Sequence, residues 1–383
     1  MPANEKSALR SPSCGADGVV RALLDARLGR RLTGIGHYTL RLAEELTGLA
    51  PDVVVLPAVR SHHRRTIAAA GGRPIVVPRR GDLAQLAPTV DVVHGPNFHA
   101  PALMGATRVA TVHDLGFIML PECHPPGMPE RLDGIIRQAL NETALYLCDS
   151  AYTRDLFMEH YGVGPARCRV VHLGVSERFS PEGPAPATIL TTCLRGVRQP
   201  YLLHVGAMIK RKDLGTLLSA FELVAVEEPE LELVLAGNKT RRWASDWPLV
   251  RDWLRSHPGL RRRVHILNYV PMAVLPKLYR EASAVVSTSL LEGFGLTALE
   301  GLASGVPVVA TAGSAIEEIA HGTAYLSPAR DASSYAEGIR LALGADPIRR
   351  ARGLELARRF TWRRTAELTL DGYRAAVNGE RRA

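Results

Sequence analysis

The chain has 383 residues, of which 46% are hydrophobic and 22% are charged, and its formal net charge is +9. Such values are typical of a soluble globular protein with two or three domains. The positive charge suits an anionic ligand or a membrane surface, and it does not indicate nucleic acid, because no aromatic-studded basic stripe or zinc-finger spacing accompanies it.

The five cysteines are scattered and lack Cys-x-x-Cys spacing, which favours reduced thiols in a cytoplasm. No apolar run approaches the roughly 20 residues that span a bilayer, and the first residues lack the apolar segment of a signal peptide. We therefore expect a cytoplasmic protein, either fully soluble or peripheral at the inner membrane face.

A glycine-containing loop precedes the first predicted helix. Gly34 and Gly36 lie in the loop at residues 33–37, and an amphipathic pattern of leucines begins at Tyr38. A Rossmann dinucleotide site is one alternative for this loop, but Thr39 stands where that fingerprint has its third glycine. A tight turn that caps the helix is the plainer alternative.

Short apolar runs bounded by Gly, Pro and Asp alternate with helical patterns, which predicts a parallel sheet covered by helices on both faces. Ligands of such sheets bind beyond the carboxyl ends of the strands. Two polar stretches, residues 94–99 and 111–115, fall at such ends. A lone histidine is usually a core or surface residue, but His113 is placed well for a site. The strands predicted in this half are 19–25, 53–56, 74–77, 90–94, 108–113 and 145–150.

A second unit begins after residues 180–186, whose dense Pro and Gly mark a domain boundary. Its first predicted strand ends at Gly206, and Arg211 and Lys212 follow shortly afterwards. Basic residues at a strand end can bind a diphosphate, Arg as a fork and Lys as a point charge. We favour this interpretation over a merely solvated basic face. The later strands are predicted at 231–237, 264–267, 284–289 and 306–310.

The strand predicted at 284–289 leads into a glycine loop. Gly293 and Gly295 permit a tight turn, and a helix begins at Leu296. A helix N-terminus beside such a loop binds anions, typically phosphate. Glu292 and Glu300 flank it, and carboxylates accept hydrogen bonds from sugar hydroxyls. The loop therefore predicts a ligand with both phosphate and sugar; the alternative is a simple turn with two solvated acids.

Two glutamates separated by seven residues around Gly-Phe-Gly resemble the signature of retaining glycosyltransferases of the GT4 type, which have the GT-B fold. The order of the other motifs extends this resemblance over nearly the whole chain. It implies an α/β protein with two Rossmann-like parallel-sheet domains that face a central cleft. Residues 18–182 would form an acceptor domain and 187–361 a nucleotide-sugar donor domain. The helix at 362–383 would cross back to the first domain, and 1–17 would be disordered.

The resemblance also implies roles for individual residues. His113 would lie near the donor sugar, and Glu292 would hold the hydroxyls of the transferred sugar. Arg211 and Lys212 would stabilise the leaving diphosphate, and Glu300 would bind the ribose. The donor-binding positions that the resemblance implies are Gly34, Gly36, Gly206, Val270, Gly293, Phe294, Gly295, Leu296 and Glu300. No Asp-x-Asp pair is present, so neither a metal nor a cofactor is expected besides the nucleotide sugar.

The implied activity is retaining transfer of a hexose to a hydroxyl acceptor, and the motifs look most like mannosyltransferases that use GDP-mannose. The acceptor would be a polysaccharide, a lipid-linked glycan or a natural product. A UDP- or dTDP-hexose donor is the alternative. A sugar-nucleotide epimerase or a nucleotide-binding pseudoenzyme is less favoured, because both glutamates and the basic pair are present. Thr297 and residues 321–324 depart from the usual family pattern, which weakens the choice of donor.

Overall fold

The protein is described by a computed structural model over residues 19–27, 34–60, 68, 75–76, 90–183, 196–239, 244–344 and 346–380. The segment 1–17, predicted to be disordered, and residues 184–186 of the predicted linker lie outside the described residues. The predicted domain boundaries stay predictions, but the two sheets of the structure fall on either side of the Pro- and Gly-rich stretch.

Within the described residues, the N-terminal sheet has seven strands in the order β3-β2-β1-β4-β5-β6-β7, and every pair is parallel. Its central strands are almost entirely buried because helices cover both faces, which explains their runs of Val, Ala and Leu. The strands are β1 Val20–Ala26, β2 Val53–Val59, β3 Ile75–Val76, β4 Val92–Gly95, β5 Thr107–Val112, β6 Thr143–Cys148 and β7 Cys168–Val170.

In the part of the chain that the structure describes, the C-terminal sheet has six parallel strands in the order β10-β9-β8-β11-β12-β13. Counted from its own first strand this is the order 3-2-1-4-5-6, which the N-terminal sheet also follows before it adds β7. The order reverses beside β1 and beside β8, and open α/β sheets bind ligands at the carboxyl ends of such positions. The strands are β8 Tyr201–Val205, β9 Glu232–Ala236, β10 Val264–Asn268, β11 Ala284–Ser287, β12 Val308–Thr311 and β13 Tyr325–Ser327.

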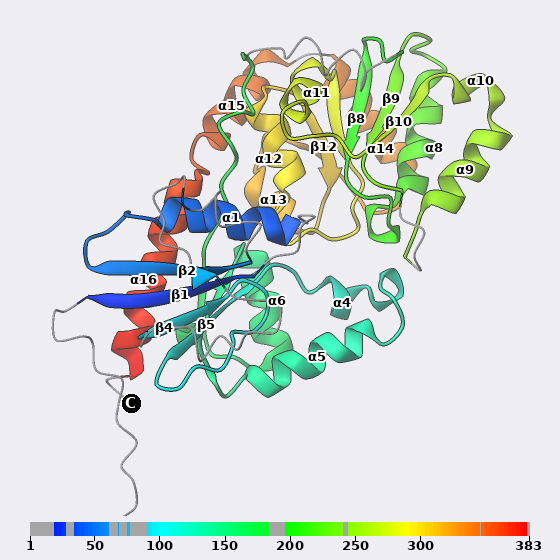
Figure 1. The fold of residues 1–383 in the computed structure, drawn as a ribbon. Coiled ribbons are helices and arrows are strands. Elements are labelled where there is room, and N and C mark those ends of the chain that lie inside the picture. The colour runs from blue at the N-terminus through cyan, green and yellow to red at the C-terminus, as the bar shows by residue number, and fades with distance from the viewer. Residues whose placement is uncertain are drawn as a thin grey trace, which may run out of the picture.

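Helices surround both sheets, and Figure 1 shows α1 running between the N-terminal sheet and the C-terminal domain above it. In the N-terminal domain they are α1 Gly34–Leu46, α4 Gly116–Met119, η2 Pro121–Cys123, α5 Met128–Ala139, α6 Ala151–Tyr161 and η3 Pro165–Arg167. In the rest of the chain they are η4 Lys210–Lys212, α8 Leu214–Ala225, α9 Trp247–Ser256, α10 Pro258–Arg261, α11 Leu275–Glu281, α12 Leu296–Ala303, α13 Ala315–Ile319, α14 Ala332–Leu343, α15 Pro347–Ala357 and α16 Trp362–Glu380.

The prediction that the first helix begins at Tyr38 after a glycine loop is wrong. Gly34 and Gly36 form the first turn of α1, and Thr39 Oγ1 donates to the carbonyl of Ile35 at 2.8 Å within the same helix. Gly36 is buried, so the helix continues to bury its inner face as far back as this residue. The free amides of the first turn, rather than a loop, are therefore what this segment could present to a ligand.

The terminal helix α16, red in Figure 1, runs from the C-terminal domain down to the N-terminal sheet, where it packs against α1 and against β5 and β6. The Tyr373 hydroxyl lies 2.8 Å from His94 Nδ1, and Arg374 forms a bidentate ion pair with Asp52. Both contacts hold the end of the chain on the N-terminal domain. No helix among the residues that the structure describes is long and apolar enough to cross a membrane.

Candidate active site between the two domains

Glu292 is the centre of a three-charge cluster in the C-terminal domain. Its Oε1 lies 2.6 Å from Lys212 Nζ, and its Oε2 lies 3.4 Å from Arg211 Nη1. The three side chains are only 11% to 17% exposed. Burial raises the pKa of Glu292, but Lys212 and Arg211 outweigh burial and hold this pKa well below its usual range. Glu292 is therefore a carboxylate at neutral pH, with a cation on each oxygen.

The backbone fixes this cluster although 80 residues separate Lys212 from Glu292. Lys212 and Arg211 follow β8, Glu292 follows β11, and these two strands are neighbours in the sheet. Thr288 Oγ1 donates to the carbonyl of Lys212 at 2.8 Å, and the Leu290 amide donates to the carbonyl of Arg211 at 2.8 Å. The turn after β8 and the loop after β11 are thus bound to each other directly.

Gly206 and His204 lie beneath the lysine. A Cβ placed on Gly206 would lie 3.0 Å from Lys212 Cε, so the lysine stem lies directly over this glycine. His204 is buried, and burial together with the charge of Lys212 lowers its pKa to about 4. It is therefore neutral at physiological pH, with Nδ1 donating to the carbonyl of Val286 at 3.1 Å. His204 therefore adds no charge to the cluster of Arg211, Lys212 and Glu292.

The predicted glycine turn leads into α12, which begins at Leu296 as expected. Gly295 caps this helix with a φ of +97°, and a Cβ there would lie 2.6 Å from Ile316 Cγ1, so only glycine fits. Phe294 is buried and its ring packs edge-on against Phe360, with centroids 5.8 Å apart. Its side chain therefore stabilises the packing around the loop, and only its backbone remains for the donor-binding role predicted from the sequence.

Glu300 lies one turn inside α12 and accepts a hydrogen bond from the Tyr279 hydroxyl at 2.6 Å. Burial raises the pKa of Glu300 to about 7, and this hydrogen bond offsets only part of the rise. Tyr279 belongs to α11, which follows the turn at Val270. Val270 itself is 9% exposed, so its side chain lies in the core and its backbone borders the same region.

Gly293 lies directly against the backbone of the N-terminal domain. A Cβ on Gly293 would lie 1.7 Å from the carbonyl oxygen of His113 and 2.8 Å from Asp114 Cβ. From the same side, Ser150 Oγ donates to the carbonyl of Gly293 at 2.7 Å and Thr153 Oγ1 does so at 3.0 Å. The sequence predicted that this glycine lets the backbone approach a ligand. What its missing side chain admits is the backbone of the other domain.

A second bridge between the domains is the carboxylate of Glu318. It accepts the amides of Ala151 and Tyr152, both at 3.0 Å, at the first turn of α6. It also lies 2.8 Å from His172 Nε2. Burial raises the pKa of Glu318, but His172 and the two amides lower this pKa by more than burial raises it. Glu318 is therefore ionised at neutral pH. A carboxylate from α13 thus caps a helix of the opposite domain.

His113 lies at the end of β5 with both ring nitrogens bonded to the protein. Nδ1 is 2.7 Å from Asp149 Oδ2, and Nε2 is 2.8 Å from the carbonyl of Pro96, which can only accept. Burial lowers the pKa of His113, but Asp149 raises it more. This histidine therefore links β5 to the loop at Pro96, and its place near the donor sugar stays a prediction.

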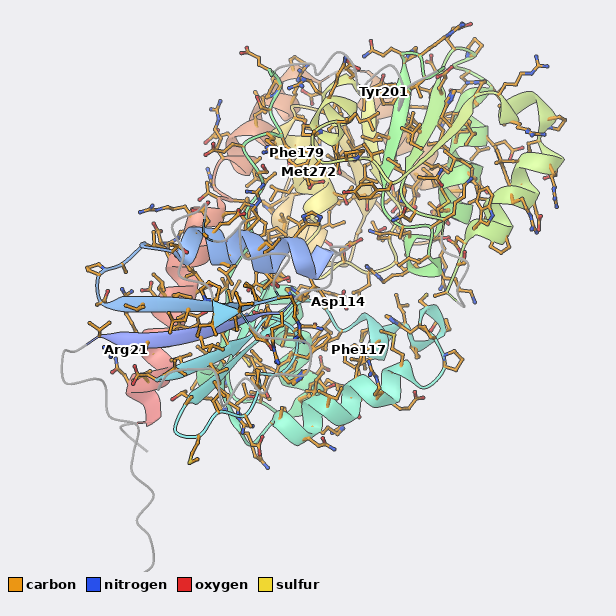
Figure 2. The ribbon with its side chains drawn as sticks, in the orientation of Figure 1. Arg21, Asp114, Phe117, Phe179, Tyr201 and Met272 are labelled. Carbon is orange, nitrogen blue, oxygen red and sulfur yellow. The ribbon has the colours of Figure 1, made fainter. Side chains whose placement is uncertain are left out.

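Asp114 and His124 are cleft residues to which the sequence analysis assigned no role. Figure 2 shows Asp114 at the edge of the N-terminal domain, facing the other domain. A Cβ placed on Gly116 would lie 3.2 Å from Asp114 Oδ1, 3.5 Å from His124 Nε2 and 3.6 Å from Arg211 Cδ, so the three side chains converge. Burial lowers the pKa of His124, which keeps it neutral. The sequence offered one signal for this group of residues: Asp114 directly follows His113 at the end of a predicted strand.

The predicted site residues lie apart from the large cavity of the C-terminal domain. The residues that the structure describes contain no group of three His, Cys, Asp or Glu side chains placed to hold a metal ion. A cavity of about 480 Å³ opens at the amino ends of the C-terminal strands, between Arg280 and Arg350, and none of the predicted site residues lines it. The predicted residues gather instead where the carboxyl ends of the two sheets face each other.

Comparison with known families assigns both halves of the chain. Residues 26–179 match the model described as Glycosyltransferase Family 4, and residues 199–344 match that of Glycosyl transferases group 1. The O-antigen chain mannosyltransferase B of Escherichia coli is 29% identical over 374 residues, which cover 90% of this chain and 96% of that protein. A D-inositol 3-phosphate glycosyltransferase of Catenulispora acidiphila is 29% identical over 76% of this chain and 73% of its own length.

Solved structures match the whole architecture. The Anabaena protein HepE, in a crystal structure with UDP and glucose, has a TM-score of 0.69 at 18% identity and covers 92% of this chain and 99% of its own. Sucrose-phosphate synthase of Thermosynechococcus elongatus has a TM-score of 0.69 at 20% identity. The match covers 93% of this chain and 98% of that one. These matches confirm the predicted fold of two parallel-sheet domains.

Proposed function

Because this chain belongs to the GT4-type glycosyltransferases with the GT-B fold, we propose that it transfers a hexose with retention of anomeric configuration from a nucleoside diphosphate sugar to a hydroxyl acceptor. GDP-mannose is the proposed donor, because a relative that matches over nearly its full length is a mannosyltransferase. A UDP- or dTDP-hexose is the alternative, and the UDP in the HepE structure favours keeping it.

The observation that carries this proposal is the cluster of Arg211, Lys212 and Glu292 at the carboxyl end of the C-terminal sheet. Two fixed cations beside the free amides of α12 suit a diphosphate that gains negative charge as the sugar leaves. Glu292 holds both cations in place and accepts hydroxyl hydrogen bonds from the sugar. Glu300, a turn further along α12, binds the ribose.

Retention is supported by Glu292 and His113, because the polar atoms of both side chains already have protein partners. Glu292 has a pKa far below neutral and a cation on each oxygen, which makes it a weak base and a weak nucleophile. Both nitrogens of His113 are bonded to protein groups. In the proposed mechanism the departing phosphate takes the proton of the acceptor hydroxyl, on the same face of the sugar as the attack.

A panel of nucleotide sugars tests the function. We expect GDP-mannose to raise the melting temperature and to release GDP faster when mannose-containing glycans are added as acceptors. Faster turnover of UDP-glucose or of a dTDP-hexose would show that this sugar nucleotide, and not GDP-mannose, is the donor. If the protein binds and turns over none of the panel, the proposed transferase activity is wrong.

The pKa of Glu300 predicts a pH-dependent affinity for the nucleotide. Below about pH 7 Glu300 is protonated, and above it the carboxylate can accept both ribose hydroxyls, so affinity should rise with pH. Calorimetry with GDP should give a roughly tenfold lower Kd at pH 8 than at pH 6. Glu300→Gln, which can still accept a hydrogen bond from Tyr279, should remove this part of the pH dependence of GDP affinity. An equal pH dependence in the wild type and in the variant would refute the ribose role.

The absence of a metal-ligand cluster among the described residues predicts a chelator-resistant enzyme. Initial rates in the presence of excess EDTA should stay within about twofold of the untreated rate. The cations Arg211 and Lys212 supply the charge that a metal would otherwise supply. Loss of activity with EDTA that manganese restores would contradict this prediction.

A further inference from the structure

The cavity of about 480 Å³ in the C-terminal domain lies at the amino ends of the strands, away from the cleft. Pro200 and Pro307, which precede β8 and β12, both line it. Figure 2 shows Tyr201, the first residue of β8, on this side of the domain, and Asp114 at the cleft. The volume is within the roughly 300–1,000 Å³ that is typical of small-molecule sites. A ligand bound here would lie apart from the groups that the proposed transfer reaction uses.

Two arginines from different helices line this cavity. Arg280 lies near the end of α11, and its Nη1 donates to the carbonyl of Ser180 at 3.2 Å. Because this acceptor is uncharged, the guanidinium keeps its full positive charge and has further N–H groups to donate. Arg350 lies in α15 and is exposed, and no described residue makes a hydrogen bond or an ion pair with its guanidinium. Both cations are therefore available to an anionic ligand.

Both arginines also lie next to the segment that joins the two domains. A Cβ placed on Gly183 would lie 2.6 Å from Arg280 Nη1. A Cβ placed on Gly305, at the end of α12, would lie 3.3 Å from Arg350 Nε and 3.1 Å from Pro181 Cγ. The two guanidinium groups, which are 70 residues apart in the sequence, are thus gathered along residues 180–183. A ligand held by both would contact the connection between the domains.

The rest of the lining offers polar groups beside an apolar surface. Ser283 is only partly buried, and its hydroxyl has no hydrogen-bond partner among the described residues. Glu228 is exposed, and its carboxylate has no cation beside it in the part of the chain that the structure describes. Leu231 and Val306 are buried and add apolar contact area. A hydroxyl and a carboxylate above apolar side chains suit the hydroxyls and the ring of a sugar.

The second acid of the lining, Asp346, is already used by the protein. Its Oδ1 accepts the amides of Ile348 and Arg349, both at 3.0 Å, and so caps the start of α15. Its Oδ2 lies 3.7 Å from Arg349 Nε. The free amides of this helix are therefore satisfied, and an anion in the cavity would depend on the side chains of Arg280 and Arg350.

We infer that this cavity is a second ligand site that binds a sugar phosphate, with the phosphate held by Arg280 and Arg350 and the sugar hydroxyls held by Ser283 and Glu228. Arg is the side chain whose donors best match the oxygens of a phosphate, and two arginines from different helices can engage a terminal phosphate from two directions. The site takes a ligand other than the donor and the acceptor, and it does not depend on which sugar the enzyme transfers.

Calorimetry with mannose 6-phosphate, inorganic phosphate and mannose tests this site. GDP is present throughout, which keeps the phosphate away from Arg211 and Lys212. We expect mannose 6-phosphate to bind at least about tenfold more tightly than mannose, because only the phosphate engages the two arginines. It should also bind more tightly than inorganic phosphate, which lacks the hydroxyls for Ser283 and Glu228. Tighter binding of inorganic phosphate would contradict the sugar part of the inference.

Arg350→Gln and Arg280→Gln locate the binding. Each should weaken mannose 6-phosphate at least about tenfold, the cost of losing a charged hydrogen-bond donor. Arg350→Gln should keep the wild-type melting temperature, because its guanidinium is exposed and has no described partner. Arg352→Gln is the matched control: Arg352 is exposed on the same helix, does not line the cavity and should bind mannose 6-phosphate as the wild type does. If wild-type affinity persists in both cavity variants, the phosphate binds elsewhere and the inference is wrong.

Discussion

An enzyme with Arg211→Gln and Lys212→Gln is expected to lose activity by a factor of at least about 10²–10³ in kcat. The two cations lie within 3.4 Å of Glu292 at the end of the C-terminal sheet, where the proposed mechanism requires positive charge on the leaving diphosphate. Affinity for the nucleoside diphosphate should fall as well, because the same charges bind the ground state. Initial rates and calorimetry with GDP measure the two effects.

This double variant leaves Glu292 largely buried without a cation, which costs on the order of 3–5 kcal/mol of stability. A triple variant that adds Glu292→Gln removes the uncompensated charge and serves as the control. Its melting temperature should recover toward that of the wild type while its activity stays low. Wild-type kcat in a folded triple variant would show that none of the three residues acts in the reaction.

Gly293→Ala is expected to lower kcat by about 10²-fold or more while leaving each domain folded. The added methyl would lie 1.7 Å from the carbonyl of His113, and neither backbone can yield without separating the domains. A displacement of about 1 Å between groups that act together is enough for a loss of this size. The circular dichroism spectrum should be unchanged, and the radius of gyration from X-ray scattering should increase.

Gly134→Ala is the matched control for this substitution. Gly134 lies within α5, a Cβ there meets nothing within 4 Å, and alanine favours a helix. Its activity should equal that of the wild type. If Gly293→Ala also turns over at the wild-type rate, the contact between Gly293 and His113 does not belong to the active arrangement.

The fold and the location of the site could be predicted because both depend on local patterns. Apolar runs marked the strands, and the strand-end rule pointed to Arg211, Lys212 and the loop after Glu292. The pairing of Lys212 with Glu292 needed the strand order, since β8 and β11 are neighbours in space but not in sequence. A carboxylate and a cation 80 residues apart have no local pattern that joins them.

Contacts between the two domains could not be predicted from the sequence. Gly293 reads as a flexible turn, and only the approach of His113 from the other domain explains why no side chain fits there. Glu318 caps α6 across the cleft, and no local pattern in the sequence indicates that contact. The start of α1 was placed four residues late, because two glycines suggest a loop where burial of Gly36 and the bond from Thr39 support a helix.

The anomeric configuration of the product tests the central claim most directly. With GDP-α-mannose as the donor, the one-bond carbon–proton coupling at the new linkage should identify an α-mannoside, because attack and departure share one face of the sugar. A β-mannoside would contradict the account. It would require a general base on the opposite face, and Asp114, which faces the C-terminal domain from the end of β5, would then be the residue to test.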